Sequence, residues 1–483
     1  MSKRIKHVVL LMALTGLLGT GTAAARSDGV PLTYNYSFWG ETVSSPAPYL
    51  PAALLTGRDL GVGPFKEPND LFVTADGDIY VLDSGNNRIV VLDRQLQPAA
   101  VIDSFVRDGQ TDTFANPQGI FVTDDKQLLI ADTGNRRIVH LDRQLNPVKV
   151  IESPESELLP ANFEFQPVRV AADMAQRLYV LAVGVFDGFM EFNADGTFTS
   201  FIGANRVWVD PVELFWKRIS TREQRSRMVL FVPTEFTSLD MNDEGFIYAT
   251  NGDRWGETIK KLNAHGNDIL RREGYFSPRG DIRYTASAGP SRLVDIDVAD
   301  SEIYSVLDAK RGRIFTYNGD GHLMYVFGGL GNKRGEFNTP VAIERIGDDF
   351  LVLDKALGEI TLFQVTEYGS TLNEAVRSYY RGDEERAVEL FRRAVDMNAN
   401  LEFAYSGIGK ALLRQGKYAE AMQYFKLSMD QRNYSKAFQL RRKEVLREYL
   451  PAVLSAAMAV TAGLLLLRKL KKLLRRKGAA TVE

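Results

Sequence analysis

Short segments in which apolar and polar residues alternate recur along the first three quarters of the chain. The clearest pair is PNDLFVTADGDIYVLDSGNNRIVVLD (Pro68–Asp93) and PQGIFVTDDKQLLIADTGNRRIVHLD (Pro117–Asp142), which follow one another at a period of about fifty residues. Each segment predicts a strand, a tight turn, a second strand, an Asp-containing turn and a third strand, with a fourth apolar stretch behind it. A repeat of this size made only of short strands is typical of propeller blades, because each blade buries its faces on its neighbours.

Six units of this kind can be traced between residues 34 and 366, and they predict a mainly β protein built as a six-bladed propeller. Four units start at a Phe that is closely followed by Pro, and two further inner strands lie in segments where apolar residues alternate around a turn. The units start within Phe65–Pro68, Phe114–Pro117, Phe165–Pro167, Thr237–Thr250, Arg292–Val306 and Phe337–Pro340.

The sixth unit is one strand short, since the sequence becomes helical after the strand expected at Glu359–Val365. Near the N-terminus, Tyr36–Gly40 is similar to the outermost segments of two other units, Thr199–Gly203 and Met324–Gly328. We therefore predict that Tyr36–Gly40 completes the sixth blade. This pairing would close the ring and cover its exposed strand edges.

From Thr371 the pattern changes to helix formers with small residues at regular positions. One set of residues recurs after a spacing of thirty-four: Gly382, Ala387, Phe391 and Ala394, then Gly416, Ala421, Phe425 and Ser428. The period and the residue order resemble tetratricopeptide repeats, in which two helices pack closely around small side chains. We expect units at 368–401 and 402–435 and a capping helix at Ser435–Glu448, together a helical domain over 368–448. Such repeats form partner-binding grooves or stalks, and the sequence leaves both open.

The two ends of the chain carry apolar segments of different kinds. Residues 1–25 have a basic start, a short apolar run and small residues before a cleavage position, as in a secretory signal peptide. Residues 449–467 lack charges, would span about 28 Å as a helix, and carry Pro451 in their first turn. The basic stretch RKLKKLLRRK (Arg468–Lys477) follows directly. We expect a transmembrane helix at 449–467 and a cytoplasmic tail at 468–483, with the bulk of the protein outside the cell.

The residues GGLGNKRGEFNTPVAI (Gly328–Ile343), together with the Asp83…Arg88 and Asp132…Arg137 pairs, resemble NHL-repeat β-propellers. The resemblance covers roughly residues 34 to 366 and is strongest in the first two units. It implies a ring that binds partners, whether protein, nucleic acid or carbohydrate. A minority of related six-bladed rings are metal-dependent lactonases or esterases, so the resemblance defines the fold better than the function.

The composition of the chain excludes several kinds of functional site. The formal net charge of the 483 residues is −2, which gives no overall attraction for nucleic acid. The chain has no Cys, which excludes a disulfide framework, a thiolate metal site, a Cys nucleophile and a lipid-modified Cys. A cleaved signal, the lack of Cys and one basic-flanked span favour the plasma membrane of a bacterium as the location.

The predicted strand order assigns the loops to two faces of the ring. All long connections join an outer strand to the next inner strand and therefore lie on one face, where binding residues tend to gather. The largest insertion, Asn205–Phe231, combines aromatic residues and arginines in a short amphipathic helix. This combination suits a protein interface or a contact with a membrane surface, and the alternative is a lid over the channel. The predicted partner-binding residues are Trp208, Phe215, Trp216, Arg218, Arg222, Arg225 and Trp255.

Catalytic residues are harder to identify. Asp83, Asp132, Asp308 and Asp354 occupy equivalent positions in their units, which indicates a hydrogen bond made in each blade rather than one unique site. After processing, His140, His265 and His322 remain, and none has His or Glu at ligand spacing. We therefore predict no catalytic, metal or cofactor site from the sequence; calcium enters only with the hydrolase alternative.

Two functions remain open. The first is a membrane-anchored scaffold that presents the propeller and the helical stalk to envelope or membrane proteins, transporter components among them, or to a cell-wall glycan. The second is a surface-anchored lactonase- or esterase-like hydrolase that uses the central channel. The two hypotheses differ in one feature, because a hydrolase needs unrepeated acidic or amide residues from different inner strands around one point. Nucleic acid is not expected as a partner, and the bilayer is contacted through residues 449–467.

Overall fold

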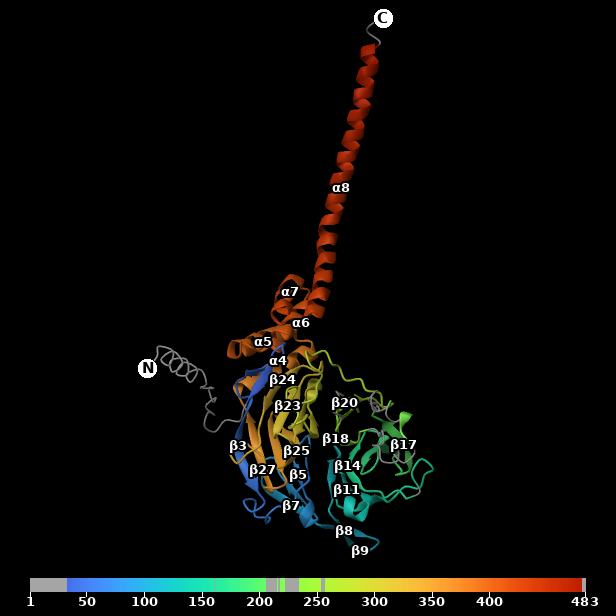
Figure 1. The fold of residues 1–483 in the computed structure, drawn as a ribbon, viewed down its shortest axis with the longest axis vertical. Coiled ribbons are helices and arrows are strands. Elements are labelled where there is room, and N and C mark those ends of the chain that lie inside the picture. The colour runs from blue at the N-terminus through green and yellow to red at the C-terminus, as the bar shows by residue number, and fades with distance from the viewer. Residues whose placement is uncertain are drawn as a thin grey trace, which may run out of the picture. The chain divides into compact units, whose positions relative to one another are not determined.

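The computed structural model describes residues 33–160, 162–205, 215, 218–221, 234–252 and 257–479. The predicted signal peptide over residues 1–25 lies outside these ranges. Within them, antiparallel sheets form the six blades of a propeller, and helices follow at the C-terminal end (Figure 1). The predicted fold class is confirmed.

Each blade is a sheet whose strands follow one another from the centre of the ring outward. Blade one contains β4 (Asp70–Val73), β5 (Ile79–Asp83), β6 (Arg88–Leu92) and β7 (Pro98–Ile102). Blade two contains β10 (Gly119–Val122), β11 (Leu128–Asp132), β12 (Arg137–Leu141) and β13 (Pro147–Ile151). Blade three contains β14 (Pro167–Ala172), β15 (Leu178–Ala182), β16 (Gly188–Phe192) and β17 (Phe198–Gly203).

Blade four has three named strands, β18 (Phe236–Met241), β19 (Ile247–Asn251) and β20 (Ile259–Leu262). A single bridge between Leu262 and Asp268 stands in the place of a fourth strand. Blade five contains β21 (Leu293–Val298), β22 (Tyr304–Asp308), β23 (Arg313–Tyr317) and β24 (Leu323–Phe327). Blade six contains β25 (Pro340–Ile346), β26 (Asp349–Asp354) and β27 (Glu359–Val365).

The core lies between the blades. The second strand of every blade is buried almost throughout. These strands have continuous apolar runs such as IYVLD and LYVLA because both of their faces pack on neighbouring blades. The inner strands contact one another in sequence from β4 to β25, and β25 contacts β4, so the ring is closed.

The N-terminal segment closes the ring, but with a different strand from the one predicted. β3 (Tyr49–Thr56) pairs with β27 along the whole strand and is the fourth strand of blade six. β1 (Tyr34–Tyr36) instead adds to β24 of blade five, and β2 (Thr42–Ser44) pairs with β1. The prediction that Tyr36–Gly40 completes blade six was therefore wrong. The physical reason is length, because eight residues of β3 can cover the free edge of β27, whereas β1 has only three.

The helical region consists of two helical hairpins and one long helix. The hairpins are α4 (Glu367–Arg381) with α5 (Glu384–Met397), and α6 (Glu402–Arg414) with α7 (Tyr418–Leu427). Small residues allow close packing here, since a Cβ on Gly407 would lie 2.7 Å from the ring of Phe391 and one on Gly409 would lie 2.7 Å from that of Phe425. Both rings are buried, as the recurrence of Phe in the two predicted units implies.

The last helix, α8 (Gln431–Ala479), is continuous where the sequence predicts a capping helix followed by a separate span. Pro451 therefore lies inside α8 rather than in the first turn of a new helix. Helix formers on both sides outweigh the one backbone hydrogen bond that Pro removes. By length and composition, Gln431–Leu473 can cross a membrane, and its apolar side chains are exposed, as Leu466 is.

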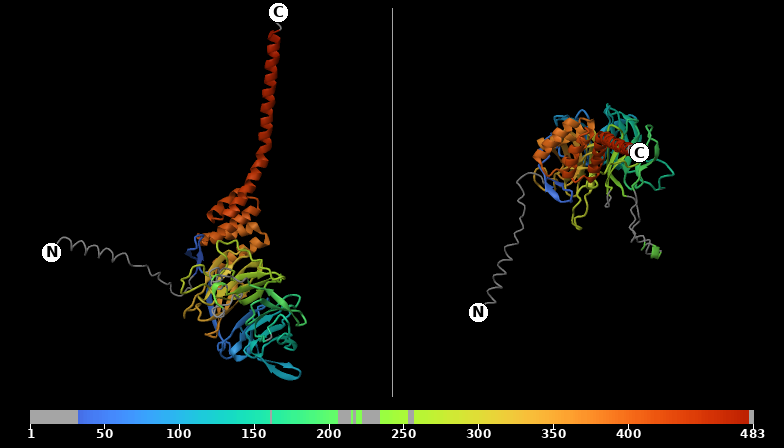
Figure 2. Two further views of the ribbon diagram at one scale, coloured as in Figure 1. Left: turned by 45° about the vertical axis from the view of Figure 1, so that its right-hand side comes forward. Right: turned by 90° about the horizontal axis from the view of Figure 1, so that it is seen from above.

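The hairpins pack on the face of the propeller that carries the tight turns (Figures 1 and 2). Arg377 of α4 forms ion pairs with Asp300 in the β21–β22 turn (3.0 Å) and with Asp348 in the β25–β26 turn (2.7 Å). Lys410 of α6 pairs with Asp320 in the β23–β24 turn (2.7 Å). Blades five and six thus carry the helices. The prediction that all long connections share the opposite face was wrong for the link that follows β20, because its Tyr275 hydroxyl donates to the backbone carbonyl of Ser428 at the end of α7 and its Glu273 pairs with Lys410 of α6.

Candidate functional site

The predicted partner-binding residues fall mostly outside the described ranges, namely Trp208, Trp216, Arg222, Arg225 and Trp255. The two described members, Phe215 and Arg218, are both exposed, and the side chain of Phe215 is 58% exposed. Their role in binding therefore stays a prediction.

Other residues of the long-connection face are described. The link between blades one and two forms a hairpin of β8 (Ser104–Arg107) and β9 (Gln110–Thr113), on which Val106 is 59% exposed. Leu158 in the link between blades two and three is 61% exposed. Exposed apolar side chains on loops held by a rigid sheet scaffold are typical of a binding surface.

The repeated aspartates form the hydrogen bonds within each blade that their repetition predicts. The carboxylate of Asp83 accepts hydrogen bonds from the Lys66 N–H (2.7 Å) and from Arg88 Nε (2.7 Å). Asp132 repeats this arrangement with the Ala115 N–H (2.7 Å) and Arg137 Nε (2.8 Å). Asp308 and Asp354 likewise accept backbone N–H bonds from the links that enter their blades. All four are fully buried, and each ties the incoming link to the turn between the second and third strands.

A second set of charged residues lies on the inner strands and is not repeated. The strand registers place one residue of each blade at the same level of the ring: Asp70, Gly119, Arg169, Ser238, Asp295 and Ala342. Two positions further along, the blades carry Phe72, Phe121, Ala171, Asp240, Asp297 and Glu344. Charge therefore gathers on blades one, three, four, five and six, around the central channel.

Most of these carboxylates cap the free edge of a neighbouring inner strand. An inner strand has a partner on only one side, so its other edge presents unpaired N–H groups. Asp70 accepts from the Ile120 N–H (2.8 Å), Asp240 from the Val298 N–H (2.8 Å) and Asp295 from the Ile343 N–H (2.7 Å). These bonds link blade one to two, four to five and five to six. They explain why acidic residues are tolerated in the centre of the ring.

Glu344 differs from the other channel acids, because among the described residues its carboxyl group has no hydrogen-bond or ion-pair partner. Burial raises the pKa of Glu344 well above its ordinary value, and nearby Asp240, Asp297 and Asp295 raise it further. Burial also raises the pKa of Asp240 to about 8 and that of Asp295 to about 7. Several channel acids therefore hold protons near neutral pH, and a protonated carboxyl group can donate a hydrogen bond.

Two arginines partly balance the acids. Arg345 Nε donates to Asp297 (2.8 Å), and Arg169 lies 3.7 Å from Asp70. One nitrogen of each guanidinium group, Nε of Arg169 and Nη1 of Arg345, is buried without a hydrogen-bond partner among the described residues. The centre of the ring therefore holds buried donors beside carboxyl groups whose pKa values are raised. Within the described ranges, no three His, Cys, Asp or Glu side chains come together in a way that could hold a metal ion.

The sequence analysis missed the channel set. A sequence pattern that could have found it is the charge inside otherwise apolar inner strands, as in LVDIDV (Leu293–Val298) and PVAIERI (Pro340–Ile346). Such a residue breaks the alternation expected of a buried strand and therefore faces either solvent or a special partner. Only the register of the six blades brings these residues to one place.

A buried polar cluster connects the propeller to the first helix. The Tyr325 hydroxyl of β24 donates to Asn373 Oδ1 of α4 (2.7 Å), and Asn373 Nδ2 donates to the Tyr49 hydroxyl of β3 (3.1 Å). All three side chains are fully or almost fully buried. Buried hydrogen bonds of this kind require a unique fit, so they favour one fixed docking of the hairpins on blades five and six.

Comparison with known proteins agrees with the repeat architecture. The NHL repeat family matches residues 65–92, in blade one. Comparison with curated protein sequences gave no relative of significant similarity. Similar solved structures include a virginiamycin B lyase from Staphylococcus aureus (9% identity, TM-score 0.38, 62% of this chain and 95% of that one). A streptogramin B lyase (13%, 0.40, 71% and 95%) and a Bacteroides thetaiotaomicron protein of unknown function (12%, 0.41, 70% and 77%) are also similar. The chain thus carries an NHL repeat within a six-bladed β-propeller.

Proposed function

We propose that this protein is a membrane-anchored, extracytoplasmic binding protein that presents the long-connection face of its propeller to envelope proteins or to a cell-wall glycan. α8 would serve as the anchor, with its basic end in the cytoplasm of a bacterium. The two hairpins, which we infer to be tetratricopeptide-like, would hold the propeller at the membrane. No chemical step is part of this role.

The observation that supports this proposal best is the contact between the first helix of each hairpin and the propeller. Here α4 and α6 are occupied by the tight turns of blades five and six, through Arg377 and Lys410. The hairpins therefore favour the stalk over the groove, and the surface left for a partner is the long-connection face.

The charge of α8 supports the orientation. The segment behind the apolar stretch of α8 is rich in Lys and Arg, as cytoplasmic flanks of spans are. Each such charge near anionic lipid is worth about 1 kcal/mol. The helix contains no break between the hairpins and the apolar stretch, so movements of the propeller and of the span would be coupled through a continuous rod.

Site-specific crosslinking in intact membranes tests the proposal. A photoreactive phenylalanine analogue would replace Val106 or Leu158 on the long-connection face of the full-length protein. We expect the same partner to crosslink from both positions and to be lost when residues 206–227 are deleted. Met174 is the matched control, because it is 85% exposed but lies in a tight turn on the opposite face. Equal crosslinking from Met174, or none from either loop position, would contradict the proposal.

One observation favours the hydrolase alternative, and it deserves its own test. Unrepeated carboxyl groups from blades one, four, five and six lie around the centre of the ring, and burial raises the pKa of Asp240 to about 8 and that of Glu344 well above its ordinary value. A protonated carboxyl group could act as a general acid on an ester or lactone. If the purified protein hydrolyses such substrates and Glu344→Gln abolishes the activity, the channel is catalytic and the binding role is incomplete.

A further inference from the structure

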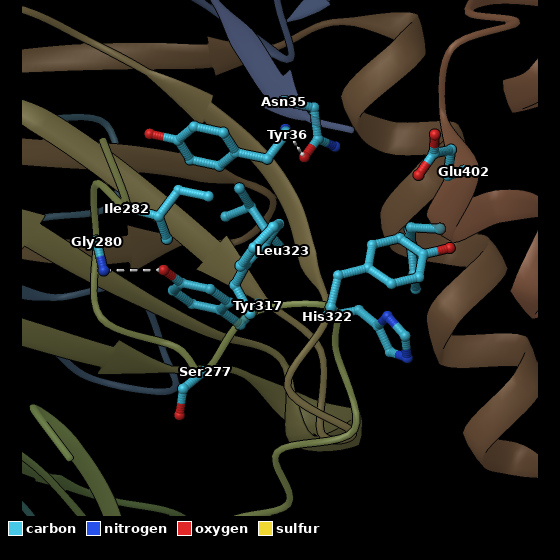
Figure 3. A pocket seen from close by; sticks show the side chains of 12 residues that line it. Asn35, Tyr36, Ser277, Gly280, Ile282, Tyr317, His322, Leu323 and Glu402 are labelled. Atoms are coloured by element: carbon cyan, nitrogen blue, oxygen red, sulfur yellow. Dashed lines mark hydrogen bonds between the residues drawn. The ribbon is translucent and has the colours of Figure 1, made fainter. Parts of the chain in front are cut away.

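A cavity lies where three distant parts of the chain meet, at the junction of blade five with the helices (Figure 3). It encloses about 480 Å³ of space, part of it open to solvent. β1 contributes one wall, the segment after β20 contributes a second, and the start of α6 with the β23–β24 turn contributes the third. The cavity shares no lining residue with the channel set, and its second wall belongs to the long link between blades four and five.

Polar contacts hold these walls in place. The hydroxyl groups of Tyr34 and Tyr36 both donate to Asp281, which fixes β1 against the segment after β20. The Gly280 N–H donates to the Tyr317 hydroxyl (3.0 Å), and the Tyr275 hydroxyl donates to the backbone carbonyl of Ser428 at the end of α7. The cavity is therefore framed by specific hydrogen bonds and not by loose packing.

The lining is aromatic with a single acid. The rings of Tyr36, Tyr275, Phe276, Tyr317 and Phe403 contribute to it. Glu402 is its one acidic side chain, and no Lys or Arg belongs to the described lining. Glu402 accepts one hydrogen bond, from the Phe38 N–H (2.7 Å). Burial raises the pKa of Glu402. No basic residue of the described lining supplies a countercharge that would offset this effect.

His322 supplies the second observation that points to a ligand. Its side chain is only 5% exposed, yet among the described residues its ring nitrogens have no hydrogen-bond partner. The ring packs against Tyr275 (6.1 Å between centroids) and Phe403 (5.6 Å) and lines the cavity. Burial lowers the pKa of His322 to about 4, so the imidazole is neutral and has one free acceptor and one free donor nitrogen.

An unusually exposed aromatic residue lies near one wall of the cavity. Trp39 is 72% exposed and packs edge-on against Phe38 (5.1 Å between centroids). Phe38 in turn packs on Tyr275, a cavity wall (5.4 Å). Because Phe38 also donates its N–H to Glu402, the exposed Trp39 is attached directly to the residues that surround the acid. Large exposed aromatic side chains are typical of binding surfaces.

We propose that this cavity binds a primary alkylammonium group, carried either by a small free amine or by a lysine side chain of a partner protein. Aromatic faces attract a cation, and one carboxylate without a basic neighbour supplies the countercharge. The ammonium group donates to Glu402, and neutral His322 offers a second acceptor elsewhere in the lining. The methylene chain packs against the apolar rings. An anion is disfavoured, because it would be placed beside Glu402 and find no cation in the lining.

Calorimetry on the full-length protein in detergent tests the proposal. The probes are n-pentylamine, Nα-acetyl-lysine methylamide and their neutral counterparts, n-pentanol and Nα-acetyl-norleucine methylamide. We expect both ammonium probes to bind at least tenfold more tightly than their neutral counterparts, as charged hydrogen bonds in partly buried sites do. Tighter binding of the lysine derivative than of pentylamine identifies a protein side chain as the natural source, and the reverse order identifies a free amine.

Two substitutions locate the binding. Glu402→Gln keeps an acceptor for the Phe38 N–H but removes the charge, and it should weaken ammonium binding about tenfold or more. Glu41→Gln is the matched control, because Glu41 is exposed, lies three residues from Phe38 and does not line the cavity. His322→Gln should weaken binding severalfold while the melting temperature shows that the protein is folded.

The proposal is overturned if neither ammonium probe binds at millimolar concentration, if the neutral probes bind equally well, or if Glu402→Gln and Glu41→Gln have the same effect. These outcomes do not depend on the crosslinking from the long-connection face.

Discussion

Two sets of acidic residues are buried in this propeller, and they differ in whether they repeat from blade to blade. Asp83, Asp132, Asp308 and Asp354 occupy the same position in their blades and are fully hydrogen-bonded. Asp240, Asp295, Asp297 and Glu344 lie on the inner strands of three blades only, and burial raises their pKa values. Acidic residues that recur at the same position in several blades therefore stabilise each blade separately. Acidic residues that do not recur gather in one region at the centre of the ring.

The difference has a physical origin in the partners that each set finds. A repeated aspartate receives backbone N–H groups and, in blades one and two, an Arg from its own blade, so its charge is compensated locally. A channel acid lies near other channel acids, and within the described ranges the set has two arginine partners, Arg169 and Arg345. Burial without enough compensating partners therefore favours the protonated form of the channel acids.

The largest effect is expected when a repeated aspartate is removed. Asp83→Ala leaves the Lys66 N–H and the Arg88 guanidinium group without their buried acceptor. Breaking one side of a buried ion pair costs about 3–5 kcal/mol. Thermal unfolding of the detergent-solubilised protein should show a melting temperature lower by several degrees. Asp132→Ala is the internal control and should behave similarly, and a loss below about 1 kcal/mol in both variants would contradict the structural role.

Removing the charge of a channel acid should stabilise the protein, in contrast to removing a repeated aspartate. The pKa of Asp240 is about 8 in the folded protein and ordinary in the unfolded chain, so the unfolded state releases its proton first as the pH rises. Stability is therefore lost between about pH 4 and pH 8. Asp240→Asn keeps the acceptor for the Val298 N–H and removes this loss.

We expect Asp240→Asn to stabilise the protein by about 1–3 kcal/mol at pH 8 and by much less at pH 5. The measurement is the melting temperature of both proteins across this pH range. A destabilisation at pH 8 similar to that of Asp83→Ala would mean that the two sets of acids do not differ as described.

The smallest effect is expected for an acid at the surface between blades. Asp78 pairs with Lys126 of the next blade at 2.7 Å, and its side chain is 31% exposed. Exposed pairs contribute about 0.2–1 kcal/mol, and salt screens them. Asp78→Asn should therefore lower stability by about 0.5 kcal/mol at low salt and by less at high salt. A loss of stability as large as that of Asp83→Ala would show that burial does not determine the relative effects of the Asp83, Asp240 and Asp78 substitutions.

The sequence predicted the blades because their pattern is local. Alternating residues and Asp-containing turns follow from the pleat and from turn chemistry, and the repeat confirms each unit by its neighbour. The paired helices are equally local, since Gly407, Gly409, Phe391 and Phe425 mark the close contacts. The closing strand was misassigned because Tyr36–Gly40 and Tyr49–Thr56 are both β-rich, and similarity to other strands does not measure the edge that must be covered.

The sequence alone determined the six-bladed class, the helical hairpins, the long apolar helix and the role of the repeated aspartates, because each of these depends on residues close together in the chain. Only the tertiary structure decided where the unrepeated charges meet, which face the helices occupy and that His322 and Glu402 share a cavity. These features join residues that are tens to hundreds of positions apart. Their proximity depends on strand register and on ring closure, which local patterns do not encode.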